Sequence, residues 1–421
     1  MFKQMFIVLI SFYTFLSANT LSELFASPTQ SEKDSVLAHW KSRDVGVYNW
    51  TVEDSGTLQG FRVDVVSHKV NSLRHYALVR YPLNYSTTEN YQLLIVNHGG
   101  MGGVDDNILK GFSKAQYEEN IVLVPSFQGE ELRTPTLALG TFTSEGETSE
   151  FDYDIDDVLA LINGAVENVT GASEENMLIT GGSRGGCVTY LVAIREPRIR
   201  KAVVNYGGTD HLTFPNIEEI VSPMIQEFTN KGPFISSIYK VASKYMNNEM
   251  SLEEARFTLL SKSPIHFINL FPDYLQFHHG DQDGAVSVEN SRSLDSVLIK
   301  SPVEGNYEYF EYPGGGHGSN MSGSSQRRDA FFAEPMLVSN NDTKFPFLNQ
   351  NTFQFRDGFL SIVGVGAESL VWIADSKGVV LNSKKIQISS RKLNVSDFGA
   401  GVYFLRMKIK GETQSFSFTV K

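Results

Sequence analysis

Short apolar segments alternate with amphipathic segments over residues 61–312, and this alternation limits the folds that the chain can adopt. The apolar segments are rich in β-branched residues and are bounded by glycine, proline or polar residues, which is typical of strands buried on both faces of a sheet. Strands that alternate with helices build a parallel sheet with helices on both faces. The sequence therefore predicts an α/β fold with a doubly wound, mostly parallel sheet. The predicted parallel strands are residues 93–97, 121–125, 177–180, 202–206, 275–278 and 307–312.

Several further segments complete this expected domain. Residues 153–166 form the clearest predicted helix, because apolar residues recur at three- and four-residue spacing behind an acidic first turn. Residues 61–66 and 76–81 are expected to pair as antiparallel strands that cover one edge of the sheet. Residues 214–260 contain amphipathic segments without a strand pattern, and we expect a helical insertion over the carboxyl edge of the sheet.

The two ends of the chain differ in composition from this domain. Lys3 precedes an apolar run, which is followed by Ser17 and Ala18, as in a secretory signal peptide. The run is shorter than the roughly 20 residues of a membrane-spanning helix. Beyond residue 335 a polar linker leads to short alternating strands with glycine-containing turns. The expected organisation is a signal peptide (1–18), an α/β domain (19–335), a linker (336–352) and a small all-β sandwich (353–421).

Charge and cysteine content exclude several classes of partner. The chain has 36 basic and 48 acidic residues, a net charge of −12, so it would repel nucleic acid. Cys187 is the single cysteine, which excludes an internal disulfide and a multi-cysteine metal site. An exported chain without disulfides favours a bacterial protein that is secreted or held at the cell surface. We expect no cofactor, no metal and, after cleavage of the signal peptide, no transmembrane segment.

A Gly-x-Ser-x-Gly motif is centred on Ser183, directly after a predicted strand and before a predicted helix over residues 188–196. A serine on such a tight turn needs Gly181 and Gly185 beside it, because the backbone is strained and the helix packs close to the strand. The turn raises the hydroxyl above the sheet, and the helix amino terminus favours developing negative charge. We therefore expect Ser183 to be a nucleophile. A glycine-rich structural turn is the alternative.

A nucleophilic serine needs a histidine base and a carboxylate that orients the base. Asp283 and His317 follow Ser183 in the chain, and each lies in a loop that leaves the carboxyl end of a predicted strand. Both loops would reach the same edge of the sheet. Asp281 is expected to cap its own turn. His278 and His279 lie at the end of a predicted strand, where a core histidine is the more common role. A metal site that they would form with His98 lacks the carboxylate spacing to support it.

Backbone amides are expected to form an oxyanion hole beside Ser183. One donor would be the N–H of Arg184, and the other the N–H of Gly100 or Met101 in the glycine-rich loop after residues 93–97. Phe127 is expected to line the substrate pocket, although a core aromatic is an equal alternative. The Arg184 side chain is expected either to form a salt bridge with an acidic neighbour or to bind a substrate carboxylate.

Residues 61–332 resemble the α/β-hydrolase superfamily and, within it, the catalytic domain of the prolyl oligopeptidase family of serine peptidases. The resemblance implies that Ser183, Asp283 and His317 are nucleophile, acid and base. It is carried by His98-Gly99-Gly100, Asp156-Asp157, Gly181-Gly182-Ser183-Arg184-Gly185-Gly186, Ser263-Pro264, His279-Gly280-Asp281-Gln282-Asp283 and Gly316-His317-Gly318.

Two features depart from the family pattern. Arg184 stands where the common nucleophile motif has Tyr or Trp. The roughly 40 residues between Ala18 and the first predicted strand leave no room for the β-propeller that gates access to these peptidases. Because propeller-less relatives include carboxylesterases, the substrate class stays open between peptides and esters.

The C-terminal segment resembles the C-terminal sorting domain of type IX secretion. The resemblance lies in residues 370–380, with their Asp-x-x-Gly hairpin, and in residues 401–406. It implies an interaction with the outer-membrane secretion machinery. A carbohydrate-binding module with Trp372 as its stacking platform is the rival interpretation.

Three function classes follow from these features. The leading prediction is a secreted serine hydrolase that cleaves peptide bonds through an acyl-enzyme, with a carboxylesterase on the same residues as the first alternative. A surface binding protein without catalysis is the second alternative. Phosphate binding at the glycine-rich turn is disfavoured, because the motif lacks the Lys-Ser/Thr continuation.

Overall fold

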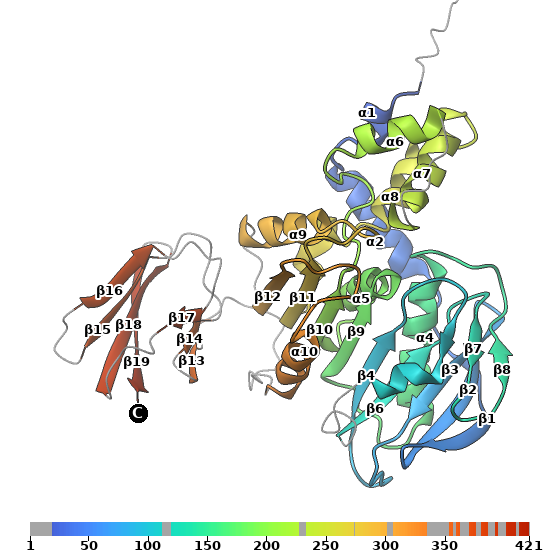
Figure 1. Cartoon of the computed structure of the whole chain (residues 1–421), viewed down its shortest axis with the longest axis horizontal. Coiled ribbons are helices and arrows are strands. Elements are labelled where there is room, and N and C mark those ends of the chain that lie inside the picture. The colour runs from blue at the N-terminus through green and yellow to red at the C-terminus, as the bar shows by residue number, and fades with distance from the viewer. Residues whose placement is uncertain are drawn as a thin grey trace, which may run out of the picture.

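The computed structural model in Figure 1 describes residues 19–111, 119–226, 233–272, 274–300 and 306–334, together with seven strands between residues 353 and 420. The predicted signal peptide (1–18) and linker (336–352) lie outside the described residues. Among the described helices, none is long and apolar enough to cross a membrane.

A nine-stranded mixed sheet forms the centre of the α/β domain, in the order β1-β2-β3-β6-β4-β9-β10-β11-β12. From β6 to β12 every neighbouring pair is parallel, whereas β1, β2 and β3 are antiparallel to their neighbours. The strands are β1 (Tyr48–Leu58), β2 (Phe61–Val70), β3 (Leu73–Arg80), β4 (Gln92–Asn97), β6 (Asn120–Pro125), β9 (Met177–Gly182), β10 (Ile199–Asn205), β11 (Tyr274–Gly280) and β12 (Asn306–Tyr312).

Every strand predicted from the alternation is present, and the mostly parallel sheet is confirmed. The antiparallel edge of the sheet differs from the prediction. The antiparallel pair β2–β3 does not form the edge, because β1 pairs with β2 on its outer side. Most residues of β1 are exposed, so this strand lacks the apolar pattern that marked the others.

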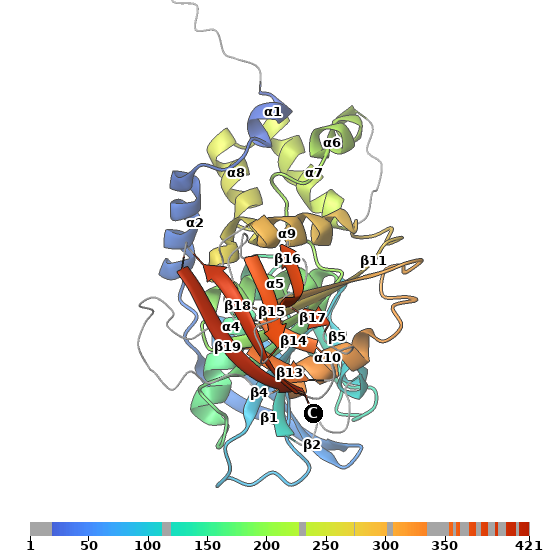
Figure 2. The same ribbon diagram turned by 90° about the vertical axis from the view of Figure 1, so that its left-hand side faces the viewer.

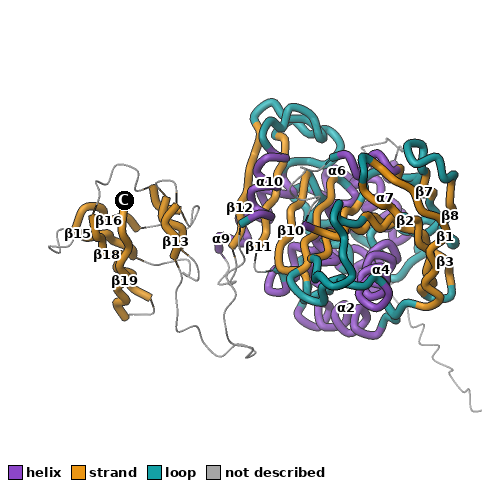
Figure 3. The backbone as a smooth tube through the Cα atoms, turned by 90° about the horizontal axis from the view of Figure 1, so that it is seen from below, coloured by secondary structure: helices purple, strands orange, loops and turns teal. Residues whose placement is uncertain are grey.

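Helices cover both faces of the sheet. Alternate residues of each central strand point to opposite faces, so Leu93 and Ile95 join one core cluster and Leu94 and Val96 the other. The first face is covered by α4 (Tyr153–Asn168), α5 (Arg184–Arg195) and α9 (Glu289–Lys300), and the second by η1 (Asp106–Lys110) and α10 (Ser324–Ala333). Figure 3 shows α4 and α10 on opposite sides of the strands. Burial on both faces explains the continuous apolar runs of these strands.

The predicted helical insertion is confirmed and consists of α6 (Ile217–Gln226), α7 (Pro233–Met246) and α8 (Leu252–Leu260). It lies beside the N-terminal helices α1 (Leu21–Leu24) and α2 (Gln30–Ser42) (Figure 2) and shares with them a core cluster separate from the two on the faces of the sheet. Arg256 links the two parts, because its guanidinium pairs with Glu32 and donates to carbonyls at the end of α1. The hydrogen bond from Arg256 lowers the pKa of Glu32 to about 2.

Three short strands form a separate sheet in the order β5-β7-β8, next to the glycine-rich loop that follows β4. They are β5 (Val104–Asp105), β7 (Glu131–Arg133) and β8 (Thr141–Thr143). The sequence did not predict them, because each has only two or three residues.

The C-terminal strands form two antiparallel sheets, in the orders β13-β14-β17 and β16-β15-β18-β19. Three pairs of strands that follow one another in the chain are paired in the structure: β13 with β14, β15 with β16, and β18 with β19. The sandwich arrangement and the sorting role stay predictions. The strands are β13 (Phe353–Arg356), β14 (Phe359–Ile362), β15 (Leu370–Asp375), β16 (Val380–Lys385), β17 (Lys392–Asn394), β18 (Gly401–Ile409) and β19 (Glu412–Val420).

The contact between α5 and β4 can be tested with Gly185. A Cβ atom at this position would lie 2.4 Å from the Asn97 carbonyl oxygen, which is backbone and cannot move aside. We expect Gly185→Ala to lower the free energy of unfolding by about 1–3 kcal/mol in urea denaturation, as overpacking does. Gly111→Ala is the control, because Gly111 is exposed and has a negative φ. Equal denaturation midpoints for the two variants would contradict this account.

Candidate active site

Ser183 lies between β9 and α5 in a strained backbone conformation, with φ of 58° and ψ of −124°. The flanking glycines permit this geometry. A Cβ atom at Gly181 would lie 2.3 Å from the Gly185 carbonyl oxygen, and Gly185 itself lies against the end of β4. The chain therefore turns sharply from strand into helix at Ser183, as the motif predicted.

The position of this turn in the sheet is equally informative. The strand order reverses between β4 and β9, since β6 lies on one side of β4 while β10, β11 and β12 follow β9 on the other. In an open α/β sheet the crevice at such a reversal is the usual place for a ligand. Ser183 follows β9 and the glycine-rich loop follows β4, so both lie at this crevice.

The structure brings Ser183, His317 and Asp283 together. The distance from His317 Nε2 to Ser183 Oγ is 2.9 Å, and that from His317 Nδ1 to Asp283 Oδ2 is 2.8 Å. An ionised Asp283 can only accept, so Nδ1 carries the proton and the lone pair of Nε2 faces the serine hydroxyl. His317 is about one-third exposed, whereas the side chain of Asp283 is fully buried.

Asp283 is held as a carboxylate. Burial by itself would raise its pKa, but hydrogen bonds from His279 and His317 and from the N–H groups of Ala285 and Val286 hold the pKa well below its usual range. Asp281 instead accepts from the Gly314 N–H at 2.7 Å, in the loop that follows β12, so its carboxylate joins two loops and does not cap its own turn as predicted.

His278 and His279 are buried core residues, as predicted. His278 bonds to Tyr312 and Gln276, and burial lowers its pKa to about 3. His279 donates from Nε2 to the Val286 carbonyl at 2.9 Å and therefore fixes the loop that carries Asp283. Within the part of the chain that the structure describes, no group of three His, Cys, Asp or Glu side chains could hold a metal ion.

Tyr206 is a residue of the site that sequence reasoning missed. It directly follows β10, has φ of 40°, and its ring centroid lies 4.6 Å from that of His317. Its hydroxyl lies near the backbone of Gly182 and Gly318, since Cβ atoms there would be 3.0 and 2.9 Å from it. Tyr206 was missed because its distinguishing feature is a positive φ, and no pattern in the sequence reveals that backbone conformation.

The glycine-rich loop of residues 98–103, called the glycine loop below, lies against Ser183. A Cβ atom at Gly99 would lie 2.8 Å from the Gly182 carbonyl oxygen and 3.3 Å from Ser183 Cβ. Gly100 has φ of 71°, which a residue with a side chain would rarely adopt. Among the described residues, the N–H groups of Gly100, Met101 and Arg184 have no hydrogen-bond partner. These are the amides predicted for an oxyanion hole.

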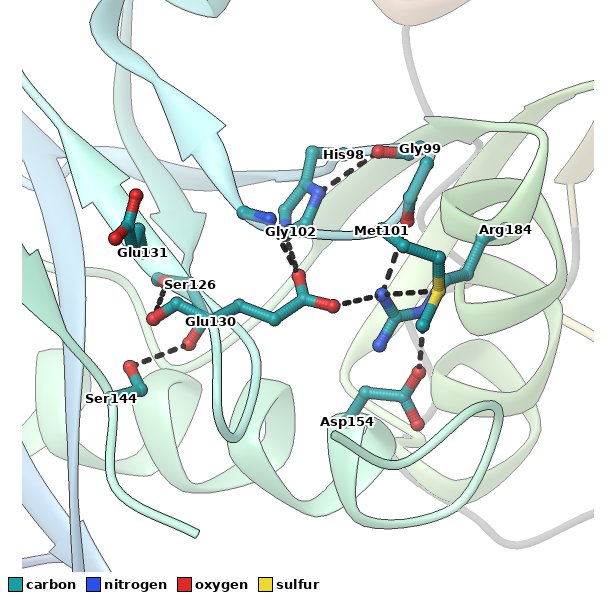
Figure 4. A network of polar contacts seen from close by, with 12 residues as sticks. His98, Gly99, Met101, Gly102, Ser126, Glu130, Glu131, Ser144, Asp154 and Arg184 are labelled. Atoms are coloured by element: carbon teal, nitrogen blue, oxygen red, sulfur yellow. Dashed lines mark hydrogen bonds and ion pairs between the residues drawn. The ribbon is translucent and has the colours of Figure 1, made fainter. Parts of the chain in front are cut away.

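The structure decides between the two predictions for the Arg184 side chain. It forms ion pairs with Glu130 and Asp154 and is only 6% exposed, so it cannot reach a substrate carboxylate (Figure 4). Phe127 is fully buried and packs against His98 and Arg184. The prediction that Phe127 lines the substrate pocket is therefore wrong, because the ring supports the glycine loop from the core.

Comparison with known proteins places this geometry in a class. Residues 140–335 match the model of the prolyl oligopeptidase family. Together with the arrangement around Ser183, this match identifies the chain as a serine hydrolase. No curated protein matches the sequence.

Solved structures support the fold. The acetyl xylan esterase from Paenibacillus sp. R4 superposes with a TM-score of 0.54 and 14% identity, over 74% of this chain and 97% of the esterase. Acetyl xylan esterase 1 from Thermoanaerobacterium sp. JW/SL YS485 gives 0.52 and 14%, over 74% and 96%. The acylaminoacyl peptidase of Pyrococcus horikoshii gives 0.46 and 14%, over 65% of this chain and 40% of the peptidase. The two esterase superpositions show that the domain has the α/β-hydrolase fold.

The low pKa of Asp283 predicts a pH-dependent contribution to stability. Because the pKa is depressed in the folded state, this contribution is present above the ordinary value of 3.8 and is lost as the pH falls towards the folded-state pKa. Asp283→Asn should therefore lower the free energy of unfolding more at pH 6 than at pH 3. Urea denaturation of the wild-type protein and of Asp283→Asn between pH 3 and pH 6 measures this difference. A difference that does not change with pH would contradict the prediction.

Proposed function

We propose that the chain hydrolyses its substrate by acyl transfer on Ser183. His317 takes the proton of the serine hydroxyl while Oγ attacks the substrate carbonyl, and then gives that proton to the leaving group. Asp283 keeps the imidazole in the tautomer that this transfer needs. Water activated by His317 then releases the acid product and frees Ser183. The observation that supports this most directly is the continuous chain of hydrogen bonds from Ser183 to Asp283.

The negative charge that develops on the carbonyl oxygen would be stabilised by backbone amides. The Arg184 N–H at the first position of α5 is one proposed donor, and the Gly100 or Met101 N–H of the glycine loop is the other. Loss of a single such donor costs about 10²- to 10³-fold in kcat in other serine hydrolases.

We propose a peptide as the substrate. The support is the match to a peptidase family over residues 140–335, which include Ser183, Asp283 and His317. The match to a family model rests on the sequence, whereas the matched structures share about 14% identity and support the fold alone.

A carboxylic ester is the second candidate. The matches to two solved structures cover nearly the whole length of those proteins, and both are named acetyl xylan esterases. In this chain the described residues ahead of the sheet form only the short helices α1 and α2. An ester reaction would use the same three residues, since a better leaving group needs no further machinery.

Substitution of the nucleophile tests the mechanism. Ser183→Ala and His317→Ala should each lower kcat by about 10⁴-fold or more, with the folded state retained, because each removes a member of the unit that forms the acyl-enzyme. The control is Ser31→Ala in α2, which should leave turnover unchanged. Turnover in folded Ser183→Ala at the control's rate would contradict the assignment.

The substrate class is tested with two synthetic substrates on the full chain, a short peptidyl-proline anilide and p-nitrophenyl acetate. Faster, Ser183-dependent turnover of the anilide would support a peptidase, and turnover of the ester alone would support a carboxylesterase. A fluorophosphonate titrates the active serine in parallel. Absence of both labelling and turnover would favour the binding protein without catalysis.

We further propose that the protein is exported from a bacterial cell, on the basis of the predicted signal peptide, and that residues 353–421 engage outer-membrane secretion machinery. The mature protein should begin at Asn19. Mass spectrometry of the N-terminal peptide from the exported fraction measures this. An N-terminus that still contains residues 1–18 would contradict export by this route.

A further inference from the structure

A buried group of polar and charged residues lies beneath the glycine loop, next to Ser183 but apart from His317 and Asp283. It consists of four residues (Figure 4): His98 directly after β4, Glu130 in the loop before β7, Asp154 in the first turn of α4, and Arg184 at the start of α5. All four side chains are nearly fully buried. Buried charges are costly unless they are paired, so the function of this arrangement needs an explanation.

Arg184 holds one peptide unit of the glycine loop. Its Nη1 donates to the Gly100 carbonyl oxygen at 3.1 Å and contacts Met101 Sδ at 3.3 Å. The carbonyl of Gly100 and the N–H of Met101 belong to one planar, trans peptide group. A contact that fixes the carbonyl therefore also fixes the direction of the Met101 N–H.

His98 holds the preceding peptide unit in the same way. Its Nδ1 lies 3.1 Å from the Gly99 carbonyl oxygen, which can only accept, so Nδ1 carries the proton. Burial lowers the pKa of His98 to about 4, and the ring is neutral at pH 7. The Gly99 carbonyl shares its peptide plane with the Gly100 N–H, so the ring fixes that amide.

Glu130 connects these contacts. Its Oε1 accepts from Arg184 Nη1, and its Oε2 accepts from the Gly103 N–H at 3.1 Å, at the far end of the glycine loop. Asp154 binds Arg184 Nε at 3.2 Å from the opposite side. The Phe127 ring lies under both His98 and Arg184, with its centroid 4.2 Å from that of the His98 ring and 4.8 Å from Arg184 Cζ. The guanidinium is therefore locked between two carboxylates and a ring, and cannot rotate away from the Gly100 carbonyl.

We propose that Arg184 is a positioning residue, whose guanidinium, anchored on Glu130 and Asp154, fixes the Gly100–Met101 peptide so that its N–H faces the oxyanion. The inference rests on the proposed acyl-transfer function. Arg184 then serves the site twice, through its own backbone N–H and through its side chain. Because Arg184 is the first residue of α5, its own N–H is fixed on the helix, and its side chain fixes the Met101 N–H on the glycine loop. The two proposed oxyanion donors therefore keep a fixed separation.

Two variants remove the side-chain role while retaining the backbone amide. Arg184→Lys keeps the charge, but one ammonium group cannot hold both carboxylates and the Gly100 carbonyl at once. Arg184→Met removes the charge and leaves Glu130 and Asp154 unpaired. The matched control is Arg195→Met at the other end of α5, because Arg195 is similarly buried and paired with buried Asp156.

The first readout is steady-state kinetics with p-nitrophenyl acetate. We expect Arg184→Lys to lower kcat about tenfold or more with little change in KM, because a displaced donor acts mainly in the transition state. Arg195→Met should keep the kcat of the wild type per titrated active site. A kcat of Arg184→Lys equal to that of Arg195→Met would overturn the inference.

The second readout does not depend on catalysis. Hydrogen–deuterium exchange of the peptide that contains the glycine loop should be at least about tenfold faster in Arg184→Lys and Arg184→Met than in Arg195→Met. Unchanged exchange would overturn the positioning role even if turnover fell. If the wild-type chain shows no Ser183-dependent turnover, the proposed function fails, while faster exchange would still support the role of Arg184 in ordering the loop.

Discussion

The close approach of α5 to the end of β4 is the constraint on which the rest of the site depends. Gly185 allows the helix to lie against the Asn97 and His98 carbonyls, where any side chain would collide with backbone. This contact forces the strained conformation of Ser183 and brings the glycine loop beside it. The strain is supported by the sheet, since β4, β9 and β10 are neighbours in its buried centre. The nucleophile and the proposed oxyanion donors are thus products of one packing arrangement.

Electrostatics then gives the two sides of Ser183 different roles. On one side Asp283 is held ionised by donors from its own loop and by His279, so that His317 keeps a defined tautomer. On the other side Arg184 stays charged because Asp154 and Glu130 outweigh the cost of its burial and raise its pKa. The first arrangement can move a proton. The second holds peptide carbonyls and an amide of the glycine loop in place.

Much of this could be predicted from the sequence, and the exceptions have physical reasons. The central strands were predictable because burial on both faces leaves continuous apolar runs, and Ser183, Asp283 and His317 because each follows such a run. The exposed edge strand β1 has no such run and was missed. The partners of Arg184 were not predictable, since Glu130 and Asp154 lie 54 and 30 residues away and no local pattern pairs them. Phe127 was misplaced because an aromatic residue after a strand fits a pocket and a core equally well.

The most direct test of the central claim is a crystal structure of the full chain after reaction with a fluorophosphonate, whose tetrahedral phosphorus resembles the acyl-transfer intermediate. The account predicts a covalent bond to Ser183 Oγ. It also predicts a phosphonyl oxygen at about 2.7–3.1 Å from the Arg184 N–H and from the Gly100 or Met101 N–H. An adduct on another residue, or a phosphonyl oxygen that faces solvent away from the glycine loop, would contradict it.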